Sequence, residues 1–244
     1  MPPRLYVDAP LAAGADLDLP PGAARHAQVL RLQPGDALVL FDGRGGEHAA
    51  AVTQMGRSAV SVRVGAHDDV ERELACIVTL ALGMPANERM DTLVEKATEL
   101  GAAAIAPLVC ERSVLRLQGE RAAKKQQHWQ GVAVAAAEQC GRTRLPHIDA
   151  VTPFAAWLSG LARPRGQVRW LLDPGGATPL AGALAALPLA AVVVVLSGPE
   201  GGLSPSERVL ARDAGFEAIG LGPRVLRADT APLAVLACLA ALAP

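Results

Sequence analysis

The sequence predicts an α/β protein in two parts: a β-rich domain at residues 1–72 and a larger domain at residues 73–244 built on a mostly parallel sheet. Three observations support this. Short apolar runs separated by turn signals crowd the first 70 residues. A charged stretch at residues 67–73 is typical of a linker. Beyond it, apolar strand-like runs alternate with helical patterns, which indicates a parallel sheet covered on both faces.

In the first domain we expect one short helix and three strands. The helix spans residues 22–32 and ends before the turn Gln-Pro-Gly-Asp. The strands span residues 37–41, 47–54 and 58–64, with Asp-Gly-Arg-Gly-Gly as the turn after the first. Turn signals at this spacing favour a small barrel.

In the second domain the expected elements alternate in type. We expect strands at residues 76–82, 105–109, 168–172, 191–196 and 218–221, and helices at 90–100, 126–140, 205–214 and 230–242. Gly101 and Gly141 end two of the helices, whereas Pro107 weakens one strand. Ser204 and Glu207 flank a proline and form a capping-box pattern. Trp129 falls within a helix pattern and is assigned to packing.

Composition narrows the protein class. Hydrophobic residues make up 51% and charged residues 19%, which favours a compact fold over disorder. No apolar stretch reaches the roughly 18 residues of a membrane span and no signal pattern opens the chain, so we expect a cytoplasmic protein without a membrane partner. The four cysteines lack metal-ligand spacing, so we expect no metal site and interpret them as buried small hydrophobic residues.

Charge is unevenly distributed although the net charge is only −1. Residues 1–75 hold seven Lys/Arg against ten Asp/Glu, whereas residues 110–147 hold seven against three. The second stretch could contact phosphates, or it could be a solvated helix face.

Three expected strands run directly into loops rich in glycine and proline, at residues 173–176, 198–202 and 221–227. Ligands bind outside the carboxyl ends of strands in such sheets, so converging loops would frame a pocket. No Rossmann or P-loop motif is present. Glu200 would repel a pyrophosphate and suits a ligand with hydroxyls or positive charge, such as S-adenosylmethionine. Each loop alone could equally be an ordinary turn.

The sequence also resembles a known family. Gly-Pro-Glu-Gly-Gly-Leu-Ser at 198–204 and Leu-Gly-Pro-Arg-Val-Leu-Arg at 221–227 resemble the ribosomal RNA small subunit methyltransferase E family. Further matches lie at residues 4–7, 26–31, 88–91, 96–101, 111–113 and 138–142, in the family's order. Two departures leave the roles of their positions open: Ala86-Asn87 replaces the usual lysine-glycine, and Asp229 replaces a glutamate.

The resemblance implies a fold and an activity. It implies a PUA-like RNA-binding β-barrel followed by a SPOUT α/β domain with a trefoil knot, working as a homodimer. It also implies S-adenosylmethionine-dependent methylation of N3 of a uridine in 16S rRNA, within the small ribosomal subunit.

We assign candidate site residues on the matching positions. We expect cofactor contacts from Leu172, Pro174, Gly198, Glu200, Gly201, Gly202, Leu221, Gly222 and Leu226. The catalytic candidates are Arg142, Arg227 and Asp229, and the RNA-binding candidates are Arg4, His26, Arg31 and Arg112. Structural alternatives stay open: a loop anchor for Glu200, ion pairs for Arg142 and Arg227, a helix N-cap for Asp229, and a structural histidine at His26.

Two rival functions remain at this point. A SPOUT enzyme could modify another base or a ribose 2′-hydroxyl, and the loops alone do not distinguish these targets. A non-catalytic RNA-binding or ribosome-assembly factor is the second rival, and it would have no reason to bind S-adenosylmethionine.

Overall fold

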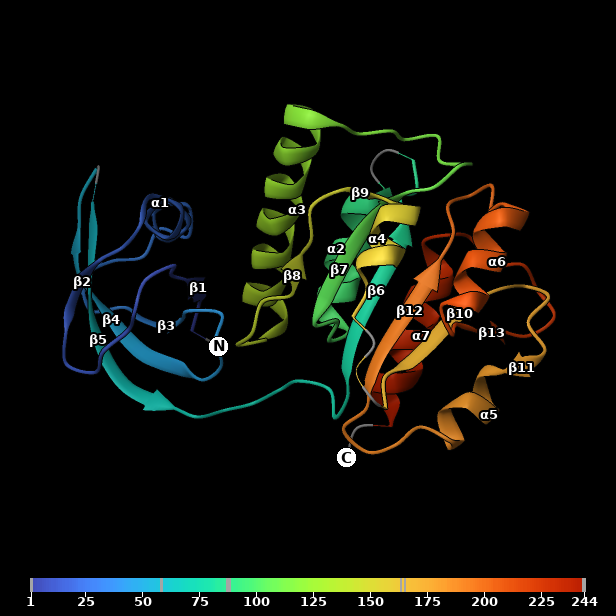
Figure 1. Cartoon of the computed structure of the whole chain (residues 1–244). Helices are drawn as coiled ribbons and strands as arrows, with labels where there is room; N and C mark the ends of the chain where they lie inside the picture. Colours follow the sequence, from blue (N-terminus) through green and yellow to red (C-terminus); the bar gives the residue numbers. More distant parts are fainter. Residues whose placement is uncertain (1, 58, 87–88, 163, 165, 243–244) are drawn as a thin grey trace. The chain divides into compact units, whose positions relative to one another are not determined.

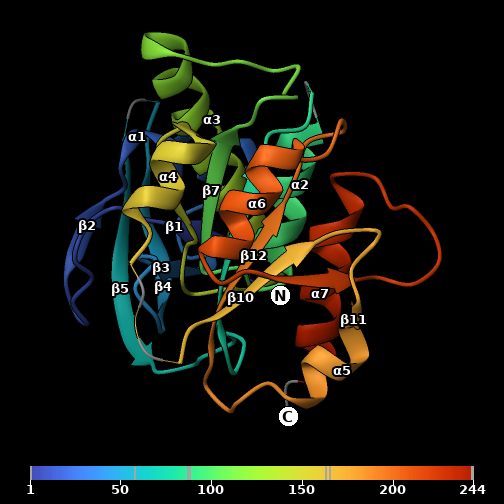
Figure 2. The same cartoon turned by 45° about the vertical axis from the view of Figure 1, so that its right-hand side comes forward.

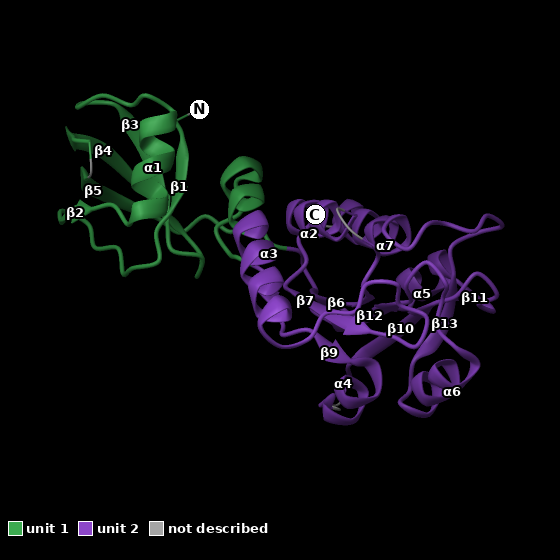
Figure 3. Ribbon diagram, turned by 90° about the horizontal axis from the view of Figure 1, so that it is seen from above, with its two compact units in different colours: residues 1–73, 134–145 green, residues 74–133, 146–244 purple. Residues whose placement is uncertain are grey.

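The computed structural model describes residues 2–57, 59–86, 89–162, 164 and 166–242. Ser58, Asn87 and Glu88, which belong to patterns named above, lie outside the described residues. The chain divides into two units, one formed by residues 1–73 and 134–145 and the other by residues 74–133 and 146–244 (Figure 3).

The first unit contains a five-stranded sheet (Figure 1). Its strands are β1 Arg4–Tyr6, β2 Asp16–Asp18, β3 Ala37–Phe41, β4 Glu47–Met55 and β5 Val60–Asp68, in the order β1-β3-β4-β5-β2. Only the β1–β3 pair is parallel. The expected strands are present, but β5 runs on through residues 67 and 68, which the sequence pattern assigned to the linker, because those residues pair with β4.

Helix α1, Pro21–Val29, packs against this sheet. Its alanines, Ala23, Ala24 and Ala27, are buried in one core with the inward residues of β3, β4 and β5. The helix ends three residues earlier than expected because Arg31 takes a left-handed conformation, with φ 57°.

Residues 134–145 belong to the first unit, although sequence order placed them in the second domain. They form the last turns of α3, Gly119–Cys140, and the segment after it. The backbone amide of Tyr6 donates to Glu138 Oε1 at 2.9 Å, and Arg142 pairs with Glu73. These polar contacts bring the end of α3 into the first unit. The functional boundary between residues 72 and 73 stays a prediction.

The second unit is built on an eight-stranded sheet whose pairings are all parallel. The order β11-β13-β10-β12-β6-β7-β8 is completed by β9, which pairs with β7. The strands are β6 Ile77–Gly83, β7 Ala104–Val109, β8 His147–Ile148, β9 Thr152–Pro153, β10 Val168–Leu172, β11 Thr178–Pro179, β12 Val192–Ser197 and β13 Glu217–Gly220. The expected α/β class with a mostly parallel sheet is confirmed. The trefoil knot stays a prediction, because strand order alone does not define threading.

Pro107 lies inside β7, opposite Leu82 of β6. On the other edge of β7, β8 pairs at Ala104 and Ile105, and β9 pairs at Leu108 and Val109. Pro107 therefore lies between the short strands β8 and β9, where its missing N–H removes no hydrogen bond between strands.

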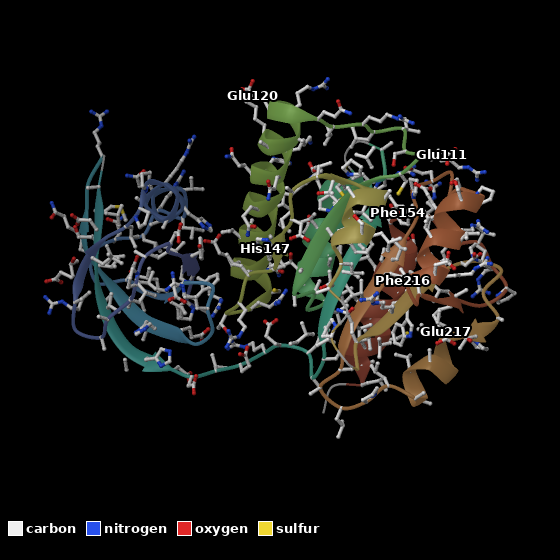
Figure 4. All side chains as sticks on the ribbon, viewed as in Figure 1. Glu111, Glu120, His147, Phe154, Phe216 and Glu217 are labelled. Atoms are coloured by element: carbon white, nitrogen blue, oxygen red, sulfur yellow. The ribbon has the colours of Figure 1, made fainter. Side chains whose placement is uncertain are left out.

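Helices cover both faces of this sheet. They are α2 Arg89–Glu99, α3, α4 Phe154–Gly160, α5 Leu180–Ala185, α6 Pro205–Asp213 and α7 Thr230–Ala241. Figure 3 shows α2 and α7 on one face, and α4 and α6 on the other. The buried apolar residues form two clusters. One includes Leu93, Trp129 and Trp170, and the other includes Phe154, Leu196 and Phe216. Phe154 and Phe216 are labelled in Figure 4.

Several elements carry no signal that the sequence analysis could use. The two-residue strands β8, β9 and β11 are too short to show a period. α3 begins at Gly119, seven residues before the expected start at 126. The first turns of the helix are polar and lack an apolar stripe, so the sequence pattern did not predict them. The expectation of buried cysteines is confirmed only for Cys110: Cys76 and Cys140 are half-buried, and Cys238 is exposed.

Among the residues that the structure describes, no helix is both long and apolar enough to cross a bilayer.

Candidate active site

The three glycine-rich loops converge at the carboxyl ends of β10, β12 and β13 (Figure 2). There they line a cavity of about 340 Å³. The lining residues are Leu171, Leu172, Asp173, Pro174, Ser197, Gly198, Pro199, Glu200, Gly202, Leu203, Arg208, Leu221, Arg224, Val225, Leu226, Arg227, Ala228 and Ala231. The expectation that these loops frame one pocket is confirmed.

Glycines shape the loop after β12. A Cβ added at Gly198 would lie 2.8 Å from the backbone nitrogen of Leu203, so the loop can close on itself only with glycine there. Gly202 has φ +66°, and its amide donates to the carbonyl of Pro199 at 2.8 Å. This tight turn brings backbone groups to the cavity wall.

The helix after this loop is capped as expected. The Ser204 hydroxyl accepts from the Glu207 amide at 3.2 Å, and the Ser204 amide donates to Glu207 Oε2 at 2.9 Å. Glu207 is buried, and its other oxygen accepts from the Glu111 amide at 2.8 Å. Glu111 therefore lies beside α6, as Figure 4 shows. One carboxylate thus fixes both the start of α6 and the loop after β7.

Glu200 anchors the loop and also lines the cavity. Its Oε1 accepts from the backbone amide of Ala86 at 2.9 Å and lies 3.5 Å from a guanidinium nitrogen of Arg89. The side chain keeps 29% of its surface exposed. The loop-anchor alternative for Glu200 is therefore confirmed by geometry, and its cofactor contact stays a prediction.

Asp173, which no sequence pattern marked as a site residue, supplies a second carboxylate to the cavity. Its Oδ1 accepts from the Gly175 amide at 2.9 Å, and its Oδ2 lies 3.3 Å from a guanidinium nitrogen of Arg208. The available signal was its position directly after β10, where parallel sheets place ligand-contacting residues. Arg208 and Arg224 line the cavity too; Arg224 belongs to the family match at residues 221–227, whereas no motif marked Arg208.

Most of the predicted cofactor-binding residues line this cavity. Gly201 and Gly222 do not: Gly201 faces Arg112, whose Cβ would lie 3.1 Å from an added Cβ, and Gly222 is exposed, with φ +94°. Both glycines shape the loops rather than the wall. Arg112, an RNA-binding candidate, donates to the Gly201 carbonyl at 3.0 Å and so supports the glycine loop.

Two of the predicted functional arginines have structural partners in the first unit. Arg142 is 3% exposed, and its guanidinium donates to Glu73 Oε1 at 2.8 Å. Arg4 pairs with Glu47, donates to the Arg142 carbonyl at 3.1 Å and stacks 5.0 Å from the Phe41 ring centre. These contacts give the ion-pair alternative for Arg142 a direct partner, and the catalytic role of Arg142 and the RNA contact of Arg4 stay predictions.

Glu47, the partner of Arg4, has a lowered pKa. Although desolvation by burial acts to raise it, hydrogen bonds from Arg4 and Arg72 hold the pKa of Glu47 below its ordinary value of 4.5. His26 Nδ1 lies 3.0 Å from Glu138, so the structural reading of this histidine has a direct partner.

Arg227 and Asp229 lie at or next to the cavity. Arg227 lines it and is exposed. Asp229 occupies the N-cap position of α7, yet its side chain makes no cap hydrogen bond, so the expectation of a capping side chain is wrong. Its Oδ1 is buried and has no hydrogen-bond partner among the described residues. A buried acceptor left unpaired is costly and calls for a donor.

Among the described residues, no group of three or more His, Cys, Asp or Glu could hold a metal ion. The absence of a metal from the reaction stays a prediction.

Family models match both parts of the chain. The model described as "RNA methyltransferase domain" matches residues 72–240, and the one described as "RNA methyltransferase PUA domain" matches residues 19–65. The N-terminal PUA-like assignment is confirmed.

Curated relatives and solved structures agree with these models. The protein named Ribosomal RNA small subunit methyltransferase E from Synechocystis is 34% identical, and the match covers 88% of this chain and 69% of the relative. The protein of the same name from Bacillus subtilis is 30% identical, and the match covers 86% of this chain and 84% of the relative. The crystal structure of such an enzyme from Neisseria gonorrhoeae, bound to S-adenosylmethionine, is 32% identical with a TM-score of 0.90 and covers 99% of this chain and 98% of its own. A second S-adenosylmethionine-bound structure, from Legionella pneumophila, has a TM-score of 0.91 at 32% identity, with coverage of 99% and 98%.

Proposed function

The chain belongs to the ribosomal RNA small subunit methyltransferase E family, and on that premise we propose that it methylates N3 of a uridine in 16S rRNA with S-adenosylmethionine as methyl donor. The observation that carries this proposal is the cavity at the carboxyl ends of β10, β12 and β13. The names of the chain's relatives describe them as ribosomal RNA methyltransferases, and the Neisseria relative binds S-adenosylmethionine.

The cavity residues fit this cofactor. The volume, about 340 Å³, falls within the range of ligand pockets. Leu171, Leu203 and Leu226 offer an apolar wall for a purine ring, and the carboxylates of Asp173 and Glu200 suit hydroxyls and a sulfonium charge. When bound, S-adenosylmethionine supplies an electrophilic methyl group. The loops would hold it in line with the attacking nitrogen, since most of the rate gain in such a transfer comes from positioning.

The reaction also requires loss of the N3 proton of uracil. We propose that Asp229 accepts it, because its buried Oδ1 lacks a hydrogen-bond donor among the described residues and Asp229 lies between the cavity-lining Ala228 and Ala231 in the chain. Arg227, on the cavity wall, would stabilise the negative charge that develops on the base. The carbon–sulfur bond of the cofactor breaks as the nitrogen–carbon bond forms, and the proton stays on the carboxylate.

The test is methyl transfer to 16S rRNA that lacks the modification. We expect label from S-adenosylmethionine on N3 of one uridine, located by mass spectrometry of nuclease digests. Label on a ribose oxygen or on another base would replace this proposal with the related SPOUT activities. Absence of cofactor binding by calorimetry would favour the non-catalytic assembly factor.

Asp229→Asn tests the proton acceptor. We expect kcat to fall by roughly 10²–10⁴, the range of general-base catalysis, with cofactor affinity unchanged. Asp229→Glu restores a carboxylate and should recover part of the activity. Asp213→Asn, at an exposed aspartate ending α6, is the matched control. Full activity in Asp229→Asn would remove the residue from the mechanism.

The remaining assignments belong to the same proposal. Residues 1–72 would bind RNA and residues 73–244 would carry out transfer, in the cytoplasm, on the RNA of the small subunit. We also propose a homodimer. Helix α7 carries no charged residue, and Ala237, Cys238 and Leu242 on or just after it are exposed. A helix that is apolar on its exposed side as well as on its buried side favours a protein partner.

Light scattering tests the dimer. Cys238→Glu should shift the protein from dimer to monomer, because it places a charge in an apolar contact. Ala123→Glu, on the exposed side of α3, is the control. A monomeric wild-type protein would contradict the dimer without affecting the reaction assignment.

A further inference from the structure

Arg208 is a cation in the first turn of a helix. Helix α6 begins at Pro205, and the Arg208 amide donates to the carbonyl of Ser204 at 3.0 Å, so the arginine belongs to the N-terminal end of the helix. That end of a helix carries partial positive charge, and a cation there is unfavourable. Residues that break a local rule of this kind are expected mainly at functional sites. The position of Arg208 therefore calls for a use of its side chain.

The guanidinium of Arg208 lies between two of the three loops that line the cavity. Its Nη1 lies 3.3 Å from Asp173 Oδ2, in the loop after β10. Its Nη2 would lie 3.7 Å from a Cβ added at Gly202, in the loop after β12. The other oxygen of Asp173 accepts from the Gly175 amide at 2.9 Å. The carboxylate that orients Arg208 is therefore held in place by its own loop.

Arg208 differs from the other two arginines of the cavity. Arg224 and Arg227 are exposed residues of the loop after β13. The Arg208 side chain is half-buried, 39% exposed, and the side chain of its partner Asp173 is 12% exposed. Exposed guanidinium groups can reach a macromolecular substrate, whereas a half-buried and oriented one favours a small ligand inside the cavity.

Arg208 keeps hydrogen-bond donors for an anion. A guanidinium has five N–H donors in a planar fork that matches a carboxylate, and Asp173 alone cannot occupy all of them. Asp173 also compensates part of the charge of the half-buried guanidinium when no ligand is bound. S-adenosylmethionine has one anionic group, the α-carboxylate of its methionine part. The remaining donors of Arg208 therefore match the single anion of the cofactor.

We propose that Arg208 binds the α-carboxylate of S-adenosylmethionine and that Asp173 orients the guanidinium for this contact. The α-ammonium group of the cofactor is bonded to the same carbon as the carboxylate, so an acid beside Arg208 suits that cation as well. Glu200, in the loop after β12, then remains for the hydroxyls or the sulfonium. This inference rests on the proposed function for the cofactor, and it is independent of which RNA atom receives the methyl group.

Decarboxylated S-adenosylmethionine isolates this contact, because it lacks the carboxylate and keeps the adenosine, the sulfonium and the amine. Calorimetry with the full-length protein should show tighter binding of S-adenosylmethionine than of the decarboxylated form. Arg208→Gln should weaken binding of S-adenosylmethionine roughly tenfold, the effect of losing one hydrogen bond between charged groups at a half-exposed site. Affinity for the decarboxylated form should stay unchanged. Arg208→Lys keeps the charge without the planar fork and should give an intermediate loss.

Arg212→Gln is the matched control, because Arg212 is an exposed arginine one turn later on α6 that does not line the cavity. Both ligands should bind this variant as they bind the wild type. The double variant Arg208→Gln with Asp173→Asn removes the acid that loses its partner, and the weaker binding of S-adenosylmethionine should persist in it. Thermal unfolding checks that Arg208→Gln stays folded, as expected when a cation leaves the N-terminal end of a helix.

Three outcomes would overturn the proposal. Equal losses for both ligands in Arg208→Gln would assign the arginine to loop support. Recovery of S-adenosylmethionine affinity in the double variant would attribute the loss to repulsion by Asp173. Unchanged S-adenosylmethionine affinity in Arg208→Gln would exclude the contact, and weaker binding of 16S rRNA in that variant would identify a phosphate as the partner. Methyl found away from uridine N3, with the carboxylate preference still lost in Arg208→Gln, would instead contradict the proposed function and leave this contact in place.

Discussion

The two units of this protein use charge in opposite ways. In the first, arginines and glutamates such as Arg4, Glu47, Glu73 and Arg142 pair with one another and join the end of α3 to the β-sheet domain. In the second, both faces of a parallel sheet are buried by apolar helix residues, and the charged residues that line the cavity lie at the carboxyl edge of the strands.

The difference shows where function can be sought in each unit. An arginine of the first unit is a structural residue unless it lacks an acidic partner, which is why Arg31 is a better RNA candidate than Arg4. A charged group at the loop edge of the second unit lines the cavity even when it also holds a loop, as Glu200 does.

Each unit can be followed separately. The tryptophans, Trp129, Trp157 and Trp170, all lie in the second unit, so their fluorescence reports on that unit alone. Amide hydrogen exchange of β3 to β5 reports on the first unit.

The largest expected effect is on the apolar core of the second unit. Leu93 of α2 is fully buried against the sheet, and Leu93→Ala should destabilise the unit by about 3–4 kcal/mol through lost burial and a cavity. Denaturant unfolding followed by tryptophan fluorescence measures this. Leu93→Met keeps the volume and should cost less than about 1.5 kcal/mol. A similar loss of stability in Leu93→Ala and Leu93→Met would mean that side-chain volume at residue 93 does not determine the stability of the second unit.

The next effect concerns the ionic contacts of the first unit. Arg142→Ala should cost about 3 kcal/mol, because Glu73 loses its buried partner. Hydrogen exchange in β3 to β5 should accelerate while S-adenosylmethionine affinity, measured by calorimetry, is retained. The double variant Arg142→Met with Glu73→Leu should recover stability. Loss of cofactor binding in Arg142→Ala would favour a site role for the arginine over the structural one.

A matched pair of glycines tests the cavity loop. Gly202 and Gly215 both have positive φ, with no atom nearer than 3.7 Å to an added Cβ, but only Gly202 lines the cavity. Alanine at either should cost about 1–2 kcal/mol of backbone strain. At Gly202 that strain should also reduce cofactor affinity roughly tenfold, since 1.4 kcal/mol is a factor of ten. Equal calorimetric affinity in the two variants would remove the loop from the site.

The smallest expected effect is a difference in acid sensitivity. Desolvation by burial acts to raise the pKa of Glu47 and of Glu71. Hydrogen bonds from arginines outweigh it and hold both pKa values below 4.5 in the folded state. Their stabilisation is therefore complete above pH 4.5 and is lost as the pH falls further, through the lowered values. Exchange in the first unit should accelerate over that range. Glu47→Gln should flatten the dependence, and an unchanged profile would contradict the assignment.

Local chemistry made part of this molecule predictable. Continuous apolar runs gave β10 its exact bounds, and the Ser204–Glu207 spacing predicted a capping box that is present. The three glycine-rich loops were placed correctly in one pocket because parallel strands bring their carboxyl ends to the same edge.

Other assignments depended on partners distant in the chain. Asp173 and Arg208 meet at the cavity although 35 residues separate them, and no motif joins them. Asp229 looked like a helix cap, but its side chain does not cap α7.

The sequence alone determined the class of fold, the two-part organisation and the loops that line the cavity, because periodicity and turn chemistry are local properties. Tertiary structure alone decided which charges are available for function. Arg4, Arg31 and Arg142 are identical residues, and only the fold places a glutamate against the first and the third. Electrostatic partners are chosen by distance in space, which residue spacing along the chain does not encode.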